Sequence, residues 1–355
     1  MSKNRIYQRS KMLIAALLLS LFCLTGCEKI NRDTKIVLTT GFTKDEVFRI
    51  ETASCYKKEV MVYLTNIQNQ YEQVYGPEIW GQEQNGVTIE QSVKESVLAE
   101  LAQIKTMNLM AEKYGISLDE SEQDAVNEAA KVYFESLTDA EKEALDVTAD
   151  TIRQLYREYA LADKVYEYMI KDVNPEISDD EARTVIAQQI LIKFAKQEGP
   201  GDTESYSEQQ RSYAYARAEE ALRRVEDGED FDVVATRYNE AAESTVSIRK
   251  GEMDAACEAA AFQLGNGEVS GIIETPEGYY ILKCVSTLNR EETDLNKIKI
   301  VEERKKEAFS REYDSYVQTL TRHMNEELWQ ETTLLHDSEV TTSSFFDVYT
   351  QYYIS

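Results

Sequence analysis

Two β-strand patterns, one over residues 187–193 and one that begins at Gly278, constrain the fold of this chain more than any other feature. The first reads Ala-Gln-Gln-Ile-Leu-Ile-Lys and the second Gly-Tyr-Tyr-Ile-Leu-Lys-Cys-Val. Short runs rich in β-branched and aromatic residues are typical of strands. Between them, a charged helix is predicted over residues 211–225, and Asp227-Gly228 ends it. The sequence therefore predicts a module that mixes strands with helices.

Several spaced anchors lie between these strands in a definite order. They are Gly-Glu-Asp-Phe at 228–231, Lys-Gly-Glu-Met at 250–253, the Ala- and Phe-containing run at 258–264, and Gly-Glu-Val-Ser at 267–270. This order resembles the parvulin-type (PpiC, rotamase) peptidyl-prolyl isomerase domain, and it is more specific than one short motif. The resemblance implies an α+β module over residues 178–287, with a small antiparallel sheet flanked by helices.

The resemblance also indicates which polar positions matter. Parvulins usually carry a histidine in each of the two strands and an Asp or Cys nearby, and here those positions hold Gln189, Tyr280 and Ser244. The chain has only two histidines, His323 and His336, and both lie beyond the module. A histidine pair therefore cannot form within it. If the topology is parvulin-like, Gln189 and Tyr280 are expected to face each other on adjacent strands, as scaffold or as support for a twisted amide.

Isomerising an X-Pro bond requires crossing a barrier of about 18–20 kcal/mol that arises from amide resonance, and it needs no nucleophile. An apolar pocket that grips the proline ring and favours the twisted amide is enough in principle. Matched to the parvulin pattern, Met253 and Phe262 occupy pocket positions, and Cys257 stands where an aromatic residue is usual. Leu191 and Ile281 are expected to support the floor. The alternative is that these are ordinary core residues.

The N-terminus has the order of a secretory signal. Positive charges precede an apolar run over residues 12–24, and Leu-Thr-Gly-Cys follows at 24–27. That run is shorter than the roughly 20 residues that a membrane-spanning helix needs. We therefore expect a lipoprotein signal over residues 1–26 and lipidation at Cys27, which would anchor the chain to the outer face of a bacterial cell membrane.

Composition excludes some partners and cofactors. The formal net charge of −26 disfavours nucleic acid, because phosphate binding needs clustered Lys and Arg. The acidity is typical of a solvated surface, although attraction to basic client segments is a second interpretation. Once Cys23 and Cys27 are set aside, the odd remainder of Cys55, Cys257 and Cys284 is not a disulfide framework. Neither Cys-x-x-Cys spacing nor a glycine-rich phosphate loop occurs, so no metal and no cofactor are predicted.

The segments on either side of the module are predicted to be mainly helical. Brief strands are expected at 35–39 and 46–50, and apolar stripes with capping signals then predict helices that begin near Val60, Thr88, Ser117, Thr138 and Thr148. After the module, a long charged helix is predicted over residues 294–329, with His323 exposed on it and His336 in the tail. Ser178 with Glu181 marks the start of the module.

A helical lobe over residues 27–177, an inserted parvulin-like module and a returning segment over 288–355 resemble the SurA/PrsA class of extracytoplasmic foldases. The resemblance implies that the C-terminal helix and tail pack on the lobe and form a cradle for unfolded secreted polypeptides. Our interpretation is a membrane-anchored folding factor whose parvulin-like domain has reduced or lost activity. An active isomerase and a surface lipoprotein without clients are the alternatives, and the sequence leaves the oligomeric state open.

Overall fold

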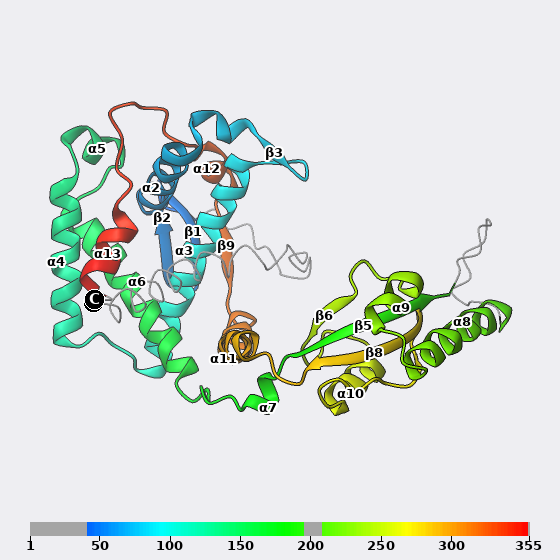
Figure 1. Ribbon diagram of the computed structural model, residues 1–355. Coiled ribbons are helices and arrows are strands. Elements are labelled where there is room, and N and C mark those ends of the chain that lie inside the picture. The colour runs from blue at the N-terminus through cyan, green and yellow to red at the C-terminus, as the bar shows by residue number, and fades with distance from the viewer. Residues whose placement is uncertain (1–40, 195–207, 354–355) are drawn as a thin grey trace, which may run out of the picture. The chain divides into compact units, whose positions relative to one another are not determined.

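The computed structural model describes residues 41–194 and 208–353 (Figure 1). The chain divides into two compact units, of which one comprises residues up to 171 together with those from 308 onwards, and the other comprises residues 172–307. We call them the helical unit and the inserted unit. The predicted signal over residues 1–26, Cys27 and the predicted strand at 35–39 lie outside the described residues.

The helical unit is built mainly from helices whose ends follow local capping rules. Gly115 ends α3 with φ +66°, a backbone conformation that glycine adopts without strain. Thr88, Thr138 and Thr148 cap α3, α5 and α6, each accepting a bond from a backbone N–H three residues on. The helices are α2 Lys57–Tyr75, α3 Ile89–Tyr114, α4 Glu120–Ser136, α5 Asp139–Ala144 and α6 Ala149–Ile170, with a 3-10 turn, η1, at Pro77–Gly81.

The predicted cap of α4 at Ser117 is wrong by two residues. Asp119 caps this helix, because its carboxylate accepts from the Glu122 N–H while the Glu122 side chain accepts from the Asp119 N–H. Leu118 is 7% exposed and packs in the core. Burial of Leu118 therefore fixes the chain just ahead of the helix, and the first turn begins after Asp119.

A three-stranded antiparallel sheet, in the order β2-β1-β9, completes the helical unit. The strands are β1 Glu46–Ile50, β2 Ala53–Tyr56 and β9 Arg322–Met324, and a separate small hairpin joins β3 Glu83–Gln84 to β4 Val87–Thr88. The predicted strand at 46–50 is therefore confirmed, and it is the central strand.

The single C-terminal helix predicted over 294–329 is wrong. Helix α11 spans Arg290–Val317, β9 follows, and the short helix α12 spans Glu326–Glu331. His323 lies on β9 opposite Arg49, not on a helix. Residues 322–324 form a strand because they pair with the edge of β1 that β2 leaves open. Their backbone groups bond to β1 instead of forming the hydrogen bonds of a helix. Along α11, the apolar side chain of Ile298 is 62% exposed, whereas that of Phe309 is buried.

Helix α13, Phe345–Tyr353, lies among the helices of the helical unit (Figure 1). Phe345 is fully buried, and its ring stacks on Tyr156 with centroids 4.4 Å apart. The Tyr156 hydroxyl donates to the Phe345 carbonyl at 2.7 Å. The aromatic tail thus supplies part of the core of this unit.

The inserted unit is a four-stranded antiparallel sheet, in the order β6-β5-β8-β7, with helices on both faces. Helices α8 and α9 cover one face and α10 the other. Gly278 permits close pairing at the start of β8, since a Cβ there would lie 2.2 Å from the Ile192 carbonyl oxygen. The elements are α7 Asp179–Ala182, β5 Val185–Lys193, α8 Glu208–Glu226, α9 Phe231–Tyr238, β6 Thr245–Ile248, α10 Ala255–Gln263, β7 Ile273–Glu274 and β8 Gly278–Ser286. The predicted α+β class is confirmed.

Candidate functional site

The two central strands of the inserted unit divide their side chains between two apolar clusters. Successive side chains of a strand point to opposite faces. Leu191 and Tyr280 therefore lie on the α10 face, whereas Ile190, Ile192 and Ile281 lie on the face that α8 and α9 cover. A site on this sheet is built from one of these faces only.

Most of the predicted pocket residues share the α10 face. Cys257 on α10 is fully buried beside Leu191 and Tyr280, and Met253 and Phe262 pack against the same cluster while remaining partly exposed. Ile281 does not share that face. The prediction that Ile281 supports the floor of the pocket is therefore wrong. Side chains alternate along β8, so Tyr280 points toward α10 and Ile281 points to the opposite face.

Gln189 is bonded to the loop that precedes β6. Its side-chain Nε2 donates to the Glu243 carbonyl at 2.9 Å, and its backbone N–H donates to the Ser244 carbonyl at 2.8 Å. The side chain is almost completely buried, with 5% of the residue exposed. Ser244 itself is exposed and contributes its backbone carbonyl to this bond. The side-chain and backbone bonds of Gln189 thus hold the loop against β5.

Gln189 and Tyr280 are not opposite each other, contrary to the expectation from the sequence. Gln189 pairs with Leu282, and Tyr280 pairs with Leu191, so the two polar residues are offset by one step on the same face. The Tyr280 hydroxyl donates instead to the Glu277 carboxylate, three residues earlier in the chain. The register of β5 on β8, which the sequence does not reveal, produces this offset.

Burial governs the protonation of the site. It raises the pKa of Tyr280, and the hydrogen bond to Glu277 together with its negative charge raises that pKa further. Burial also raises the pKa of the Cys257 thiol to about 12, and the charges of Asp254 and Glu277 add to the effect. Both side chains are therefore neutral at physiological pH, and neither offers a thiolate or a phenolate as nucleophile.

Three residues that the sequence did not single out complete this face. Glu277 accepts from Tyr280 and Glu243 accepts from Gln189, as described above. Arg183 lies over the Phe262 ring at 4.8 Å from its centroid and donates to the Phe262 carbonyl at 3.1 Å. Only Glu277 had a local signal, since it is three residues from Tyr280 across a turn. The other contacts depend on the tertiary fold.

Chemically, this arrangement offers apolar walls and neutral hydrogen-bond donors. Met253 and Phe262, which pack on the buried Leu191, supply partly exposed apolar surface that suits a proline ring, whereas Gln189 and Tyr280 are already bonded to the protein. Within the described residues, no group of three or more His, Cys, Asp or Glu side chains is placed to hold a metal ion. Cys257 and Cys284 are free thiols.

Comparison with known proteins agrees with this geometry. Residues 190–286 match the family described as Rotamase, PPIC-type PPIASE domain. The chain is 26% identical over 226 residues to the foldase protein PrsA of Caldanaerobacter subterraneus subsp. tengcongensis. The chain is thus similar to a PrsA foldase and carries a match to the PpiC-type domain. The match covers 59% of this chain and 62% of that relative, which is less than two thirds of the relative's length.

Solved structures of foldases are similar at lower identity. The crystal structure of the peptidylprolyl isomerase PrsA from Bacillus cereus is 15% identical, with a TM-score of 0.34, over 86% of this chain and 98% of that chain. A structure from a study of two SurA-like chaperones of Campylobacter jejuni is 12% identical, with a TM-score of 0.28, over 79% of this chain and 98% of that chain.

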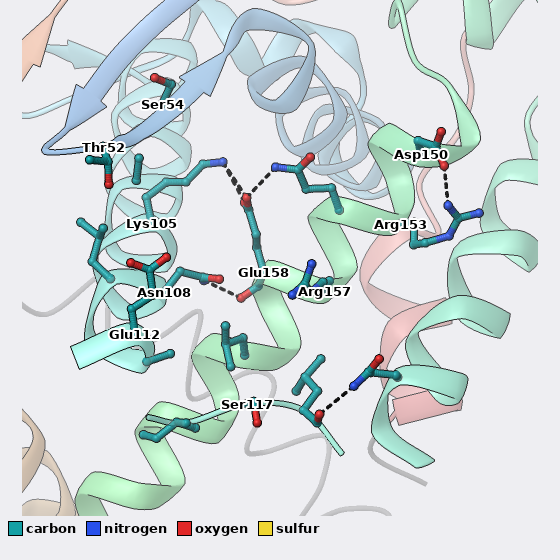
Figure 2. Close-up of a pocket in the computed structure, with 18 of the residues that line it drawn as sticks. Thr52, Ser54, Lys105, Asn108, Glu112, Ser117, Asp150, Arg153, Arg157 and Glu158 are labelled. Carbon is teal, nitrogen blue, oxygen red and sulfur yellow. Dashed lines mark hydrogen bonds and ion pairs between the residues drawn. The ribbon is translucent and has the colours of Figure 1, made fainter. Parts of the chain in front are cut away.

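The helical unit carries a second candidate site, a pocket of about 750 Å³ (Figure 2). The β1–β2 hairpin, α3 and α6 supply most of its lining. Lys105 lies at its base and is 3% exposed, and its Nζ donates to Glu59 at 3.0 Å and to Glu158 at 2.8 Å. Burial lowers the pKa of Lys105, but the charges of Glu158 and Glu59 outweigh burial and hold the pKa above its ordinary value.

Proposed function

We propose that this chain is a lipid-anchored, extracytoplasmic folding factor that binds unfolded secreted polypeptides through its helical unit, and that its PpiC-type domain has reduced or lost isomerase activity. The names of its relatives, foldase and SurA-like chaperone, support the general role. The pocket of the helical unit supports the place of client binding.

One observation supports reduced activity above all. The two strand positions where parvulins carry histidines hold Gln189 and Tyr280, and each is bonded to a neighbouring protein group rather than to the other. A side chain held in this way stabilises the fold, and it has little freedom to stabilise a twisted amide that appears only during turnover.

The alternative is an active peptidyl-prolyl isomerase. The shared apolar face of Met253, Phe262, Cys257 and Leu191 favours it, because grip on the proline ring is part of the chemistry. Cis/trans exchange of a proline peptide decides between the two functions. We expect weak or undetectable acceleration, and acceleration equal to that of a histidine-bearing parvulin would overturn the proposal of reduced activity.

Client binding is tested by separating the parts of the chain. A variant in which a short Gly/Ser linker replaces residues 182–286 should still slow the aggregation of an unfolded protein. The isolated residues 178–287 should not. The reverse result would move client binding to the PpiC-type domain, and failure of the intact protein to bind any unfolded chain would favour a surface lipoprotein without clients.

Membrane anchoring is tested at Cys27. We expect Cys27→Ala to release the protein from the membrane fraction and to abolish labelling by a fatty acid, because the thiol is the proposed point of acylation. No helix in the described part of the chain is long and apolar enough to cross a membrane. Absence of fatty-acid label from the wild-type protein would contradict the anchor.

A further inference from the structure

Strand β2 lies at an edge of the sheet in the helical unit. Among the described residues β1 is its only strand partner, and the pairing places Ile50 opposite Ala53 and Arg49 opposite Ser54. A two-residue turn joins the strands, so Ile50 and Ala53 form the hydrogen-bonded pair that closes the hairpin. Hydrogen-bonded and non-hydrogen-bonded pairs alternate in such a ladder. The backbone N–H and C=O of Ser54 therefore point away from β1.

The free edge belongs to the pocket shown in Figure 2. Thr52, Ala53, Ser54 and Tyr56 all line it, together with residues of α3 and α6. Ala53 and Ser54 are partly exposed. The opposite lining includes apolar side chains, among them Leu109, Leu118 and Leu161. Unpaired backbone groups thus stand beside apolar surface in one cavity, which is the combination that a bound β-strand uses.

The charges of the pocket suit a polypeptide better than an ion. Six charged residues line it with equal numbers of each sign, namely Lys105, Arg153, Arg157, Glu112, Asp150 and Glu158. Lys105 and Arg153 have carboxylate partners in Glu158 and Asp150. Arg157 is exposed, and among the described residues it has no ion-pair partner. Glu112 likewise leaves its carboxylate unpaired on α3.

This balance contrasts with the net charge of −26 of the whole chain. Among the described residues, the pocket therefore offers an acidic polypeptide no excess of negative charge, with the guanidinium of Arg157 and the carboxylate of Glu112 as its two unpaired charged groups. A bidentate bond from Arg157 is the strong form of carboxylate recognition. Charge complementarity thus favours an acidic side chain of the ligand at Arg157.

We propose that an extended segment of an unfolded client adds to β2 as a strand, with an acidic side chain at Arg157 and apolar side chains in the pocket. This inference rests on the proposed function and names the place and the mode of client binding. Pairing through the backbone recognises any extended chain, which suits a folding factor with many clients, and the pocket then adds preference among sequences.

A matched pair of substitutions at Ser54 tests the strand addition. Ser54→Pro removes the outward N–H, and proline is tolerated on an edge strand where the N–H faces outward. Ser54→Ala keeps that N–H but removes the hydroxyl, which donates to Glu46 at 2.6 Å. Binding of a short synthetic peptide with alternating Val and Ser and one central Glu is measured by fluorescence anisotropy on the mature full-length protein. We expect about three- to tenfold weaker binding for Ser54→Pro than for Ser54→Ala.

Arg157→Gln gives a second test that leaves the sheet untouched. It should weaken binding of the Glu peptide and leave binding of a matched Gln peptide unchanged. Hydrogen exchange provides an independent readout, because strand addition should protect the Ser54 amide when the peptide is present. Circular dichroism shows whether Ser54→Pro remains folded, and if it does not, the Arg157→Gln and exchange results decide.

Distinct outcomes separate this inference from the proposed function. If the wild-type protein binds no unfolded chain, the proposed function fails as well. If it binds the peptide, while Ser54→Pro matches Ser54→Ala and the Ser54 amide gains no protection, only the strand addition is overturned. A second copy of this chain, or another part of the same chain, is the occupant if Ser54→Pro abolishes dimerisation or lowers thermal stability without changing peptide affinity. Loss of dimerisation, or lower thermal stability with unchanged peptide affinity, would overturn the proposal that a client binds at β2.

Discussion

Asn66 in the helical unit and Tyr280 in the inserted unit are buried polar side chains with different roles. In the helical unit, Asn66 on α2 accepts from the Phe345 N–H at 3.0 Å and donates to the Tyr133 hydroxyl at 2.8 Å. The partners of these bonds come from distant parts of the sequence. On the α10 face of the PpiC-type domain, Tyr280 bonds to Glu277, only three residues away. Asn66 thus connects remote segments, as Gln189 does on the α10 face by bonding to Glu243, whereas Tyr280 stabilises a turn.

The same contrast extends along the C-terminal segment. Gln68 on α2 accepts from the Leu335 N–H at 3.0 Å and donates to the Leu335 carbonyl at 2.7 Å. Glu141 accepts from the backbone N–H groups of Thr341 and Thr342. Side chains of the N-terminal helices thus satisfy the backbone of a segment that has few ladder bonds of its own. These bonds join distant parts of the sequence, whereas the hydroxyl bond of Tyr280 to Glu277 joins residues of one turn.

The largest effect is expected from breaking a long-range bond. Asn66→Ala should lower the free energy of unfolding of the helical unit by about 3 kcal/mol, because the buried Phe345 N–H loses its acceptor. Urea unfolding of the intact protein measures the loss. Asn127→Ala, at an exposed position on α4, is the matched control and should change stability by less than about 0.5 kcal/mol. Equal losses of stability in the two variants would show that the bonds of Asn66 contribute no more than an exposed side chain does.

The second prediction concerns turnover at the α10 face. Relative to a histidine-bearing parvulin, we expect isomerisation of a proline peptide to be at least about 100-fold slower, since preorganised polar groups commonly contribute a few kcal/mol to a barrier. Tyr280→Phe should leave any residual rate unchanged, because the hydroxyl is bonded to Glu277. Met253→Ala should lower a residual rate that depends on apolar grip. A large loss in Tyr280→Phe would show that this hydroxyl acts in catalysis.

How far the sequence predicted the structure follows from the same contrast. Local signals are reliable: Thr88, Thr138 and Thr148 mark helix starts where the sequence predicts them, and the two strands of the inserted unit lie at the predicted positions. The chemistry of a cap or of a strand pattern is contained in a few neighbouring residues. Such features need no knowledge of the rest of the fold.

Features that depend on remote partners were missed. Strand β9 was taken for helix because its partner, β1, lies far away in the sequence. The offset between Gln189 and Tyr280 and the place of Ile281 depend on the register of β5 on β8. Most of the predicted pocket residues nevertheless share the α10 face, because the family pattern carries tertiary information that periodicity lacks. The pocket beside β2 had no signal of either kind.

The third prediction concerns two carboxyl groups of the helical unit, Asp163 and Glu100, of which Asp163 bonds to α13. Asp163 on α6 accepts from the Tyr349 hydroxyl at 2.6 Å. Burial raises the pKa of Asp163 to about 7, despite the opposing effect of the Tyr349 bond, and the charge of Glu167 adds to the rise. Burial, together with the charge of Asp163, also raises the pKa of Glu100 to about 7.

Because both pKa values are higher in the folded state, the folded protein binds these protons more tightly than the unfolded chain. The free energy of unfolding should therefore fall as pH rises from about 4 to about 7 and then level off with respect to these groups. Asp163→Asn should remove the part of that fall that comes from Asp163 and reduce the part that comes from Glu100, whose pKa the charge of Asp163 raises. Urea unfolding at several pH values checks this, with the exposed Asp124→Asn as control. Identical pH profiles for wild type and Asp163→Asn would exclude Asp163 as a source of the pH dependence.

The smallest effect is expected from a local bond within the helical unit. This bond tests whether the sequence distance between the partners, or the unit in which they lie, determines how much a polar group contributes to stability. Asp119 and Glu122 form a reciprocal cap at the start of α4, three residues apart, as Tyr280 and Glu277 are. Asp119→Ala should lower the free energy of unfolding by about 1 kcal/mol, the usual cost of a lost N-cap.

Ser117→Ala is the control for this cap, because the sequence pattern placed it at Ser117, and it should cost less than about 0.5 kcal/mol. Thermal unfolding followed at 222 nm measures both variants. If Asp119→Ala costs as much as Asn66→Ala, then location in the helical unit, rather than the sequence distance between bonded partners, governs how much a polar group stabilises this protein.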